Sequence, residues 1–200
     1  MTETWNLDRL ENIGGHKTEI IGEPKLEKTS KGEAVVFDGI GNGLIVHSNP
    51  LRNAEAFTVE IIFNPAKSDS PNNVEQRFIH FQNLKNENSR ILIELRLTKD
   101  NLWFLDTFIK SDDQALTLYA EKFPHPVAQW YHAALVYEKG LMKHFVNHVE
   151  EMSGNVSYVP IEEADTSIGM RINHVSWFKG AIKTLRVTDK ALSPSEFLKI

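Results

Sequence analysis

The stretch HFVNHVEE at residues 144–151 places two histidines and two glutamates within eight positions. His144 and His148 are four residues apart, a spacing that on a helix would let two imidazole rings chelate zinc. On a strand the same spacing separates them by about 13 Å, which is too far for one ion. Gly140 and the pair Phe145-Val146 favour strands over a helix. We therefore predict a β-hairpin rather than a metal site.

The centre of this hairpin is Asn147-His148, where Asn-Gly would be usual. A type I′ turn requires positive φ at both central residues. Asn tolerates this conformation, and His is among the few other residues enriched in it. We predict that His148 is a turn residue and that Glu150 and Glu151 are surface charges on the returning strand.

The composition is that of a chain able to build a core without disulfides. Of its 200 residues, 41% are hydrophobic and 24% are charged, as expected for a soluble domain. The absence of cysteine excludes disulfides, thiolate metal ligands and cysteine nucleophiles. A net charge of −5 argues against binding to nucleic acid, and the apolar runs are too short for membrane insertion. The chain as given carries no signal-peptide pattern.

Short alternating apolar and polar segments predict a chain made almost entirely of β-strands. The expected strands are 17–21, 34–37, 43–47, 57–64, 77–82, 90–98, 102–109, 130–137, 141–147, 166–170 and 178–187. Turn-forming residues separate them, a spacing typical of a sandwich or jelly roll. Residues 66–75 are predicted to form a surface loop between two strands.

Two short helices are expected near the ends of the chain. Leu7, Leu10 and Ile13 would share one helical stripe that Gly14-Gly15 ends. Near the C-terminus, Ser193-Pro194-Ser195-Glu196 has a capping-box pattern with proline at the first helical position.

Several segments, taken in order, carry a resemblance to a known family. They are FDGIGNGLIV (37–46), LRNAEAFTVEIIFNP (51–65), RFIHF (77–81), ILIELRLT (91–98), QWYHAALVYEKGLMKHFVN (129–147), SIGMRI (167–172) and FKGAIKTLRVTDKALSPSEF (178–197). This order resembles the laminin-G-like jelly-roll domains of the concanavalin A-like lectin/glucanase superfamily. Those domains show an F-D-G turn, an F-T-V-E strand, a W-x-H-x-A strand and a late F-x-G-x-I strand. The resemblance implies two antiparallel sheets packed face to face, one of them concave, with carbohydrate bound by the concave face or rim loops in many relatives.

The resemblance also raises the possibility of hydrolysis, because some members are laminarinase-type glycosidases with E-x-D-x-E or E-x-D-x-x-E on one strand. The nearest match here is Glu163-Ala164-Asp165, and the third acid is replaced by Ser167 or Ile168. The motifs G-x-S-x-G and H-E-x-x-H and a glycine-rich phosphate loop are also absent. A carboxylate pair assembled from different strands stays open as an alternative.

Calcium is the cofactor that the resemblance makes a candidate. Many related domains hold calcium at the sandwich rim with Asp or Asn side chains and carbonyl oxygens, as a hard cation prefers. The candidate ligands here are Asp38, Asn42, Asp165 and Asn173. Relatives often read G-x-I-D in the late strand, whereas this chain has Lys183 in place of the aspartate, which would repel a cation.

A sugar site commonly combines an aromatic platform with groups that hydrogen-bond hydroxyls. The candidate ligand-binding residues are Trp177, Trp103, Arg96, His132 and Arg171. Trp177 is preferred because it lies in a polar loop, RINHVSWFKG, where a large aromatic has less reason to belong to the core.

We predict an all-β fold, a two-sheet antiparallel β-sandwich of the jelly-roll type with short terminal helices. Residues 1–33 are expected to be an N-terminal extension packed on the sandwich and 34–200 the jelly roll, in a single domain overall. The predicted role is a non-catalytic binding domain for carbohydrate. The alternatives are a polysaccharide-active glycoside hydrolase with an unrecognised carboxylate pair and a protein–protein adhesion module. The resemblance implies an extracellular or periplasmic location if a signal was removed, and the sequence does not indicate an oligomeric state.

Overall fold

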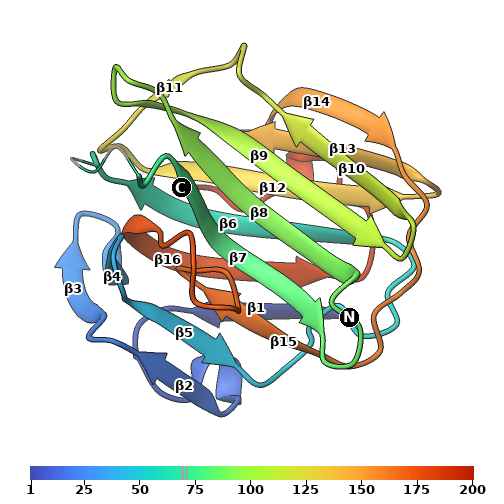
Figure 1. Ribbon diagram of the computed structural model, residues 1–200, viewed down its shortest axis with the longest axis horizontal. Helices are drawn as coiled ribbons and strands as arrows, with labels where there is room; N and C mark the ends of the chain where they lie inside the picture. Colours follow the sequence, from blue (N-terminus) through green and yellow to red (C-terminus); the bar gives the residue numbers. More distant parts are fainter. Residues whose placement is uncertain (69, 71) are drawn as a thin grey trace.

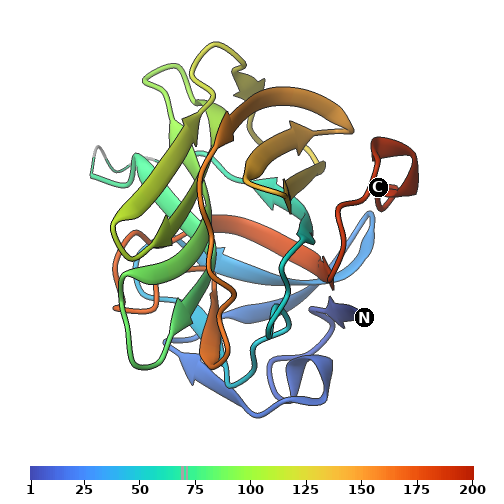
Figure 2. The same ribbon diagram turned by 90° about the vertical axis from the view of Figure 1, so that its right-hand side faces the viewer.

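Two antiparallel sheets packed face to face form the protein in the computed structural model, which describes residues 1–68, 70 and 72–200 (Figure 1). This is the all-β sandwich that the sequence predicts. Seen from the side, both chain termini lie away from the strands drawn in green and yellow-green (Figure 2). In the described chain, no helix has the length and apolar character needed to cross a membrane.

The first sheet, sheet A, carries the strands of the predicted hairpin and of the late F-x-G-x-I segment. Its order is β14 (Val149–Asn155), β13 (Leu141–Val146), β12 (Tyr131–Glu138), β6 (Phe57–Pro65), β16 (Lys179–Thr188), β4 (Gly32–Asp38) and β3 (Lys25–Thr29). The strand β1 (Thr2–Asn6) pairs with β16 as well.

The second sheet, sheet B, lies in front in Figure 1. Its order is β10 (Gln114–Tyr119), β9 (Leu102–Ser111), β8 (Ser89–Leu97), β7 (Glu75–Asn83), β15 (Ala164–Ile168), β5 (Gly43–Val46) and β2 (Thr18–Ile21). The short β11 (His125–Pro126) pairs with β9. Strand pairs far apart in sequence, such as β15 with β5 and β7, tie the sheet together.

Strand alternation explains both the core and the opposite face of sheet B. In β8 the apolar residues Ile91, Ile93 and Leu95 are fully buried against sheet A, and their removal from water is the main force that holds the layers together. The residues between them, such as Glu94, therefore point away from the core. Aromatic rings fill the centre, where Phe63 stacks on Phe78 with ring centroids 4.7 Å apart.

The N-terminal residues contribute strands to both sheets, since β1 and β3 join sheet A and β2 joins sheet B. The strands β1 and β3 were not predicted, and neither were β10 and β11, whereas β14 is the returning strand of the predicted hairpin. The helix predicted from Leu7, Leu10 and Ile13 is wrong, because only the 3-10 turn Ile13–Gly15 forms there. Leu7 and Ile13 are buried and Leu10 packs on the core, so their spacing reflects an irregular segment anchored by apolar contacts.

The hairpin turn and the C-terminal capping box have the local geometry that the sequence predicts. Asn147 and His148 have φ of 47° and 70°, which confirms the hairpin turn with positive φ at both residues. The C-terminal capping box is also confirmed, although it starts only the 3-10 turn Pro194–Glu196. The predicted loop at 66–75 lies between β6 and β7, whose first residue is Glu75; positions 69 and 71 fall outside the described residues.

Gly180 shows why the late strand needs a glycine. Its φ is 145°, and a Cβ at this position would lie 2.2 Å from the carbonyl oxygen of Asn64 on β6. The two backbones approach too closely for any side chain, so this position of the F-x-G-x-I segment needs a glycine.

Candidate functional site

Charged side chains gather on the side of sheet B that faces away from the core. Strand register places Arg77, Glu94 and Asp106 in one row across β7, β8 and β9. A second row joins His80, Leu92 and Phe108 and continues to Thr117 on β10. We name this surface the charged face, and its residues are Glu75, Arg77, His80, Arg90, Leu92, Glu94, Arg96, Asp106, Phe108, Thr117 and Arg171.

A β-bulge in β7 shapes the charged face. The register with β8 shifts between Arg77 and Ile79, so Phe78 and Ile79 are both buried in the core. Arg77 and His80 consequently lie on the outer side although they are three residues apart, a spacing that a regular strand would not allow. Bulges are common beside functional sites for this reason, because they redirect side chains.

The loop before β16 brings Arg171 to the same face. The backbone N–H of Arg77 donates to the carbonyl of Ser176 at 2.8 Å, and the Arg77 guanidinium bonds the Ser176 hydroxyl. The N–H of Ile172 donates to Nδ1 of His80 at 3.2 Å. Three hydrogen bonds with β7 therefore fix the position of the loop, and Arg171 lines the cavity beside it.

Ion pairs connect one end of the charged face. Arg77 Nε lies 3.1 Å from Glu94 Oε2, and Arg96 Nε donates to Asp106 Oδ2 at 2.8 Å. Both arginines also contact Glu75, which joins the two pairs into one network. Glu94 is 3% exposed and Asp106 is 1% exposed, so these charges are removed from water and depend on their partners.

Burial shifts the protonation of these groups. It raises the pKa of Glu94 to about 7, against an opposing effect of Arg77. It also raises the pKa of Asp106, and the bond to Arg96 offsets that effect only in part. Burial, followed by the charges of Arg171 and Arg90, lowers the pKa of His80 to about 3, so this imidazole is neutral near pH 7.

Several buried polar atoms of the charged face lack a hydrogen bond to any described residue. They are Nε of Arg77, Arg90 and Arg171, Nε2 of His80, Oε2 of Glu94 and Oδ1 of Asp106. Buried polar groups are rarely left in this state, because an unmade hydrogen bond costs about 1–3 kcal/mol. Arg77 Nε and Glu94 Oε2 are the partners of one ion pair, and the other four atoms make the charged face a candidate site for a polar ligand.

A cavity of about 180 Å³ opens between these side chains. Leu92 and Phe108 supply its apolar surface, and Thr117 adds a hydroxyl at the β10 side. Beyond it, Tyr119 is 42% exposed and its ring faces the Arg96 guanidinium at 5.6 Å. The space equals roughly six water volumes of about 30 Å³ each, which suits one sugar ring with its hydroxyls directed at charged groups.

A larger hollow, of about 550 Å³, lies at the edge of the sandwich. Hydroxyl and amide side chains with Val74, Leu97 and Lys99 line it. It offers more space, but six of the nine buried side-chain atoms that lack a hydrogen bond among the described residues lie on the charged face, which is therefore the better candidate site.

The structure brings together two of the five predicted ligand-binding residues, Arg96 and Arg171. Trp177 is half-buried in the loop that carries Arg171, with its ring 6.1 Å from that of His174. Trp103 is fully buried between the sheets, where its Nε1 donates to the carbonyl of Pro126 at 3.2 Å. A side chain enclosed in this way has no surface to offer a ligand.

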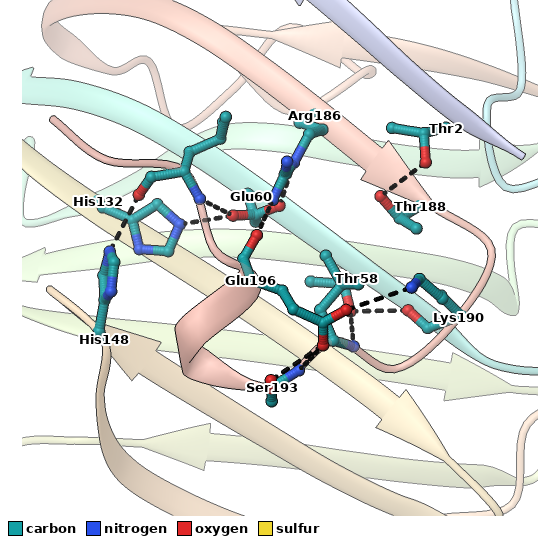
Figure 3. A network of polar contacts seen from close by, with 12 residues as sticks. Thr2, Thr58, Glu60, His132, His148, Arg186, Thr188, Lys190, Ser193 and Glu196 are labelled. Carbon is teal, nitrogen blue, oxygen red and sulfur yellow. Dashed lines mark hydrogen bonds and ion pairs between the residues drawn. The ribbon is translucent and has the colours of Figure 1, made fainter.

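His132 lies on the other sheet, beneath the C-terminal segment (Figure 3). Its Nε2 donates to Glu60 Oε1 at 3.0 Å, and both side chains are fully buried. The same carboxylate contacts Arg186 and accepts the backbone N–H of Leu198 at 2.7 Å. This cluster attaches the C-terminal segment to sheet A, whereas the charged face belongs to sheet B.

The two histidines of HFVNHVEE also have structural partners. His144 is fully buried and its Nδ1 bonds the hydroxyl of Thr107 on sheet B at 2.9 Å. His148 Nε2 donates to the carbonyl of Leu198 at 2.9 Å (Figure 3). Glu150 pairs with Lys143 at the surface, whereas Glu151 differs from the expectation of a surface charge, since its carboxylate is 3% exposed and pairs with His125.

The four predicted calcium ligands do not form one set. Asp38 and Asn42 share the turn before β5, where Asp38 Oδ1 already accepts three backbone N–H groups and Asn42 bonds the backbone of Glu23. Asp165 on β15 bonds His47, and Asn173 belongs to the exposed loop after β15. Among the residues that the structure describes, no group of three His, Asp or Glu side chains is placed to hold a metal ion. The four predicted ligands therefore do not fit a calcium site.

Sequence reasoning missed most of the charged face. The signal that was present is the alternation RILIELRL in β8, which puts Arg90, Glu94 and Arg96 on one side of a strand. The partners on β7 and β9 could not be found without the pairing of the strands and the bulge at Phe78.

Comparisons with known proteins agree with this architecture. Domain 4 of AbnA, a GH43 extracellular arabinanase from Geobacillus stearothermophilus in complex with arabinotriose, is 20% identical over 97% of this chain and 94% of its own, with a TM-score of 0.72. A SAP-like pentraxin from Limulus polyphemus is 15% identical over 80% and 77%, with a TM-score of 0.61. The CBM40 of the Ruminococcus gnavus IT-sialidase is 18% identical over 88% and 95%, with a TM-score of 0.59. These likenesses show the fold alone.

Among curated proteins, no sequence matches the chain. A family model, described as the laminin-G type of the concanavalin A-like lectin/glucanases superfamily, matches residues 38–197. That match covers most of the sequence and includes the strands that carry the charged face. The chain therefore belongs to the concanavalin A-like lectin/glucanases superfamily.

Proposed function

We propose that the protein is a carbohydrate-binding domain and that the charged face is its binding site. The observation that carries the proposal is the set of buried polar atoms without hydrogen bonds around one cavity of about 180 Å³. Sugar hydroxyls donate and accept hydrogen bonds, so one ring could satisfy carboxylates and guanidiniums together. Leu92 and Phe108 would contact the apolar side of the ring.

Two further points support the proposal. Several solved structures of the same fold have names that refer to carbohydrate, among them the arabinanase domain in complex with arabinotriose. The candidate residues also come from four adjacent strands and one anchored loop, a rigid support for a binding site. We propose that the full chain, with residues 1–33 contributing strands to both sheets, acts as one binding domain.

The test is a glycan and polysaccharide array with the wild-type chain and the variant Phe108→Ala. We expect wild-type binding to at least one glycan and a loss of about tenfold or more in the variant, because the ring loses its apolar contact. Phe123→Ala is the matched control, since Phe123 is 43% exposed and does not line the cavity. Trp177→Ala would show whether the loop tryptophan adds a second contact.

Equal loss in both phenylalanine variants would place the site elsewhere. Absence of glycan binding by a folded wild-type chain would overturn the proposal and favour the protein–protein adhesion alternative.

One observation favours a second candidate function, glycoside hydrolysis. Glu94 and Asp106 are register partners on β8 and β9, and directly opposed side chains have Cβ atoms about 4.5–5.5 Å apart. Retaining glycosidases use two neighbouring carboxyl groups, and a pKa of about 7 would suit Glu94 as the acid. This is a pair assembled across strands, as the sequence left open.

Binding is the better supported function because both carboxylates are already engaged. Asp106 is bonded to Arg96 and Glu94 is paired with Arg77, which weakens an attack on carbon by either. Incubation of bound glycans with wild type and Glu94→Gln separates the two functions. Product release by wild type that disappears in the variant would establish hydrolysis instead.

A further inference from the structure

We propose that the sugar held by the charged face carries an acid group and that Arg90 and Arg171 bind this group. The inference rests on the proposed function, because it specifies the ligand of the same site. It would make the protein a receptor for glycans with a uronic or sialic acid unit, or for glycans whose sulfate ester takes the position of that carboxylate.

The four arginines of the charged face fall into two classes. Arg77 and Arg96 each contact two carboxylates. Arg90 instead donates to the backbone carbonyl of Glu87 and lies over the ring of Phe108, with Cζ 5.3 Å from its centroid. The Arg171 guanidinium has no hydrogen bond or ion pair with any described residue. Two guanidiniums therefore lack a carboxylate partner.

The unpaired arginines lie close enough to influence each other. Burial lowers the pKa of Arg90 first, and the charge of Arg171 lowers it further, against smaller opposing effects of Glu87 and Glu94. Lys110 is the register partner of Arg90 on β9 and adds a third cation at this end. Like charges held together with little water are unfavourable unless an anion joins them. The opposite end of the face, by contrast, pairs its charges internally.

His80 is a fully buried neighbour of Arg90 and Arg171, although it is not among the residues that line the cavity. Its Nδ1 accepts the N–H of Ile172, so the proton of the neutral ring is on Nε2. That N–H is buried and has no partner among the described residues. A donor without charge beside two guanidiniums suits an acid group, which accepts hydrogen bonds in several directions.

The chemistry of the guanidinium selects the ligand class. Its planar donors match a carboxylate in a two-point contact, and such charge-assisted bonds are about twice as strong as neutral ones. A ring seated on Leu92 and Phe108 would direct its acid group towards Arg90 and Arg171. Its hydroxyls would then face Glu94 and Oδ1 of Asp106, an oxygen that accepts no hydrogen bond from any described residue.

Calorimetric titration of the full chain with matched ligands tests the inference. The probes are lactose, sialyllactose and sulfated lactose, together with trigalacturonic acid and its methyl ester, which has the same skeleton without charge. We expect the acidic member of a set to bind about tenfold to hundredfold more tightly than its neutral counterpart. The sulfated probe distinguishes a sulfate from a carboxylate as the recognised group.

Arg171→Gln is the decisive variant, because removal of a guanidinium without a partner leaves no buried charge unpaired. It should lower affinity for the acidic probe about tenfold or more and leave affinity for the neutral probe within about twofold. Arg90→Gln should have the same effect. Arg52→Gln removes an exposed charge outside the cavity and is the matched control.

The outcomes separate the inference from the proposed function. Equal affinity for acidic and neutral probes, unchanged in Arg171→Gln, would overturn the inference and leave carbohydrate binding intact. A loss of neutral and acidic binding alike in Arg171→Gln would also overturn it, since the arginine would then hold hydroxyls. Failure to bind any probe or arrayed glycan would overturn both.

Discussion

The titration of Glu94 predicts an unusual effect of pH on stability. The carboxyl group has a pKa of about 7 in the folded protein and 4.5 in its ordinary state. Below pH 4.5 it is neutral in both the folded and the unfolded chain, and its favourable contribution to folding is complete. Between pH 4.5 and 7 only the unfolded chain releases the proton, so stability falls as pH rises and the contribution is lost through pH 7.

The magnitude follows from the size of the shift. Each pKa unit corresponds to about 1.36 kcal/mol, and about two units lie between pH 5 and the folded pKa. The free energy of unfolding of the wild type, relative to Glu94→Gln, should therefore fall by about 3 kcal/mol between pH 5 and pH 8. Gln has the same shape and can still accept a hydrogen bond, so the comparison isolates the charge.

Urea unfolding of both proteins at pH 5, 6, 7 and 8 measures this difference. The buried histidines titrate in both chains, and the subtraction removes their effect. Glu94 faces Arg77 and Glu75 from β7, Arg96 from β8 and Asp106 from β9, and these groups are present in both chains as well. A difference that stays constant within about 0.5 kcal/mol would show that Glu94 is ionised and solvated at pH 5, and the account of the charged face would fail.

Three other perturbations test separate parts of the molecule. Burial lowers the pKa of His144 to about 3, so the contribution of this residue to stability is present above pH 6.5 and is lost as pH falls. In urea unfolding, the wild type should lose about 2 kcal/mol more free energy of unfolding than His144→Gln between pH 6.5 and pH 5. Parallel pH dependence in the two proteins would contradict this. Trp103→Ala should cost about 3–5 kcal/mol in the same assay while glycan affinity of the folded fraction is kept, and a selective loss of affinity would make it a ligand contact after all. The Phe197 ring packs on the rings of His132 and Phe145, with centroids 5.3 and 5.2 Å away. Phe197→Ala should therefore lower the free energy of unfolding by about 3 kcal/mol and speed hydrogen exchange in the C-terminal segment. Unchanged exchange would show that the ring does not hold the segment.

The architecture could be predicted because it depends on patterns that a single strand displays. Alternation in ILIELRLT and in FTVEIIF is a property of each segment alone, and the turn at Asn147-His148 needs only its own φ angles. The strands β1 and β3 escaped prediction because their apolar content is low; β3 has the sequence KLEKT and its residues are mostly exposed. Edge strands of this kind are held by backbone pairing, which leaves little trace in composition.

The site could be predicted only in part, because its residues become neighbours through pairing and not through spacing. Arg96 and Arg171 were recognised as polar candidates, but nothing in the sequence shows that β8 lies between β7 and β9. Trp103 was an unsuitable candidate for a physical reason. A large aromatic carries the greatest gain from burial, so Trp103 entered the core, whereas the smaller Phe108 stayed half-exposed on the charged face.

The charged face and the Glu60 cluster show how similar groups acquire different roles. Around Glu60, both carboxylate oxygens are engaged by His132, Arg186 and the backbone N–H of Leu198, and the C-terminal segment covers the cluster (Figure 3). On the charged face, the Asp106 carboxylate is buried to a similar degree, yet its Oδ1 has no hydrogen bond to any described residue and the side chain lines an open cavity. Burial without full satisfaction lowers stability, and the binding of a polar ligand would recover that energy. The difference between the two clusters is therefore the physical basis for assigning structure to one and ligand binding to the other.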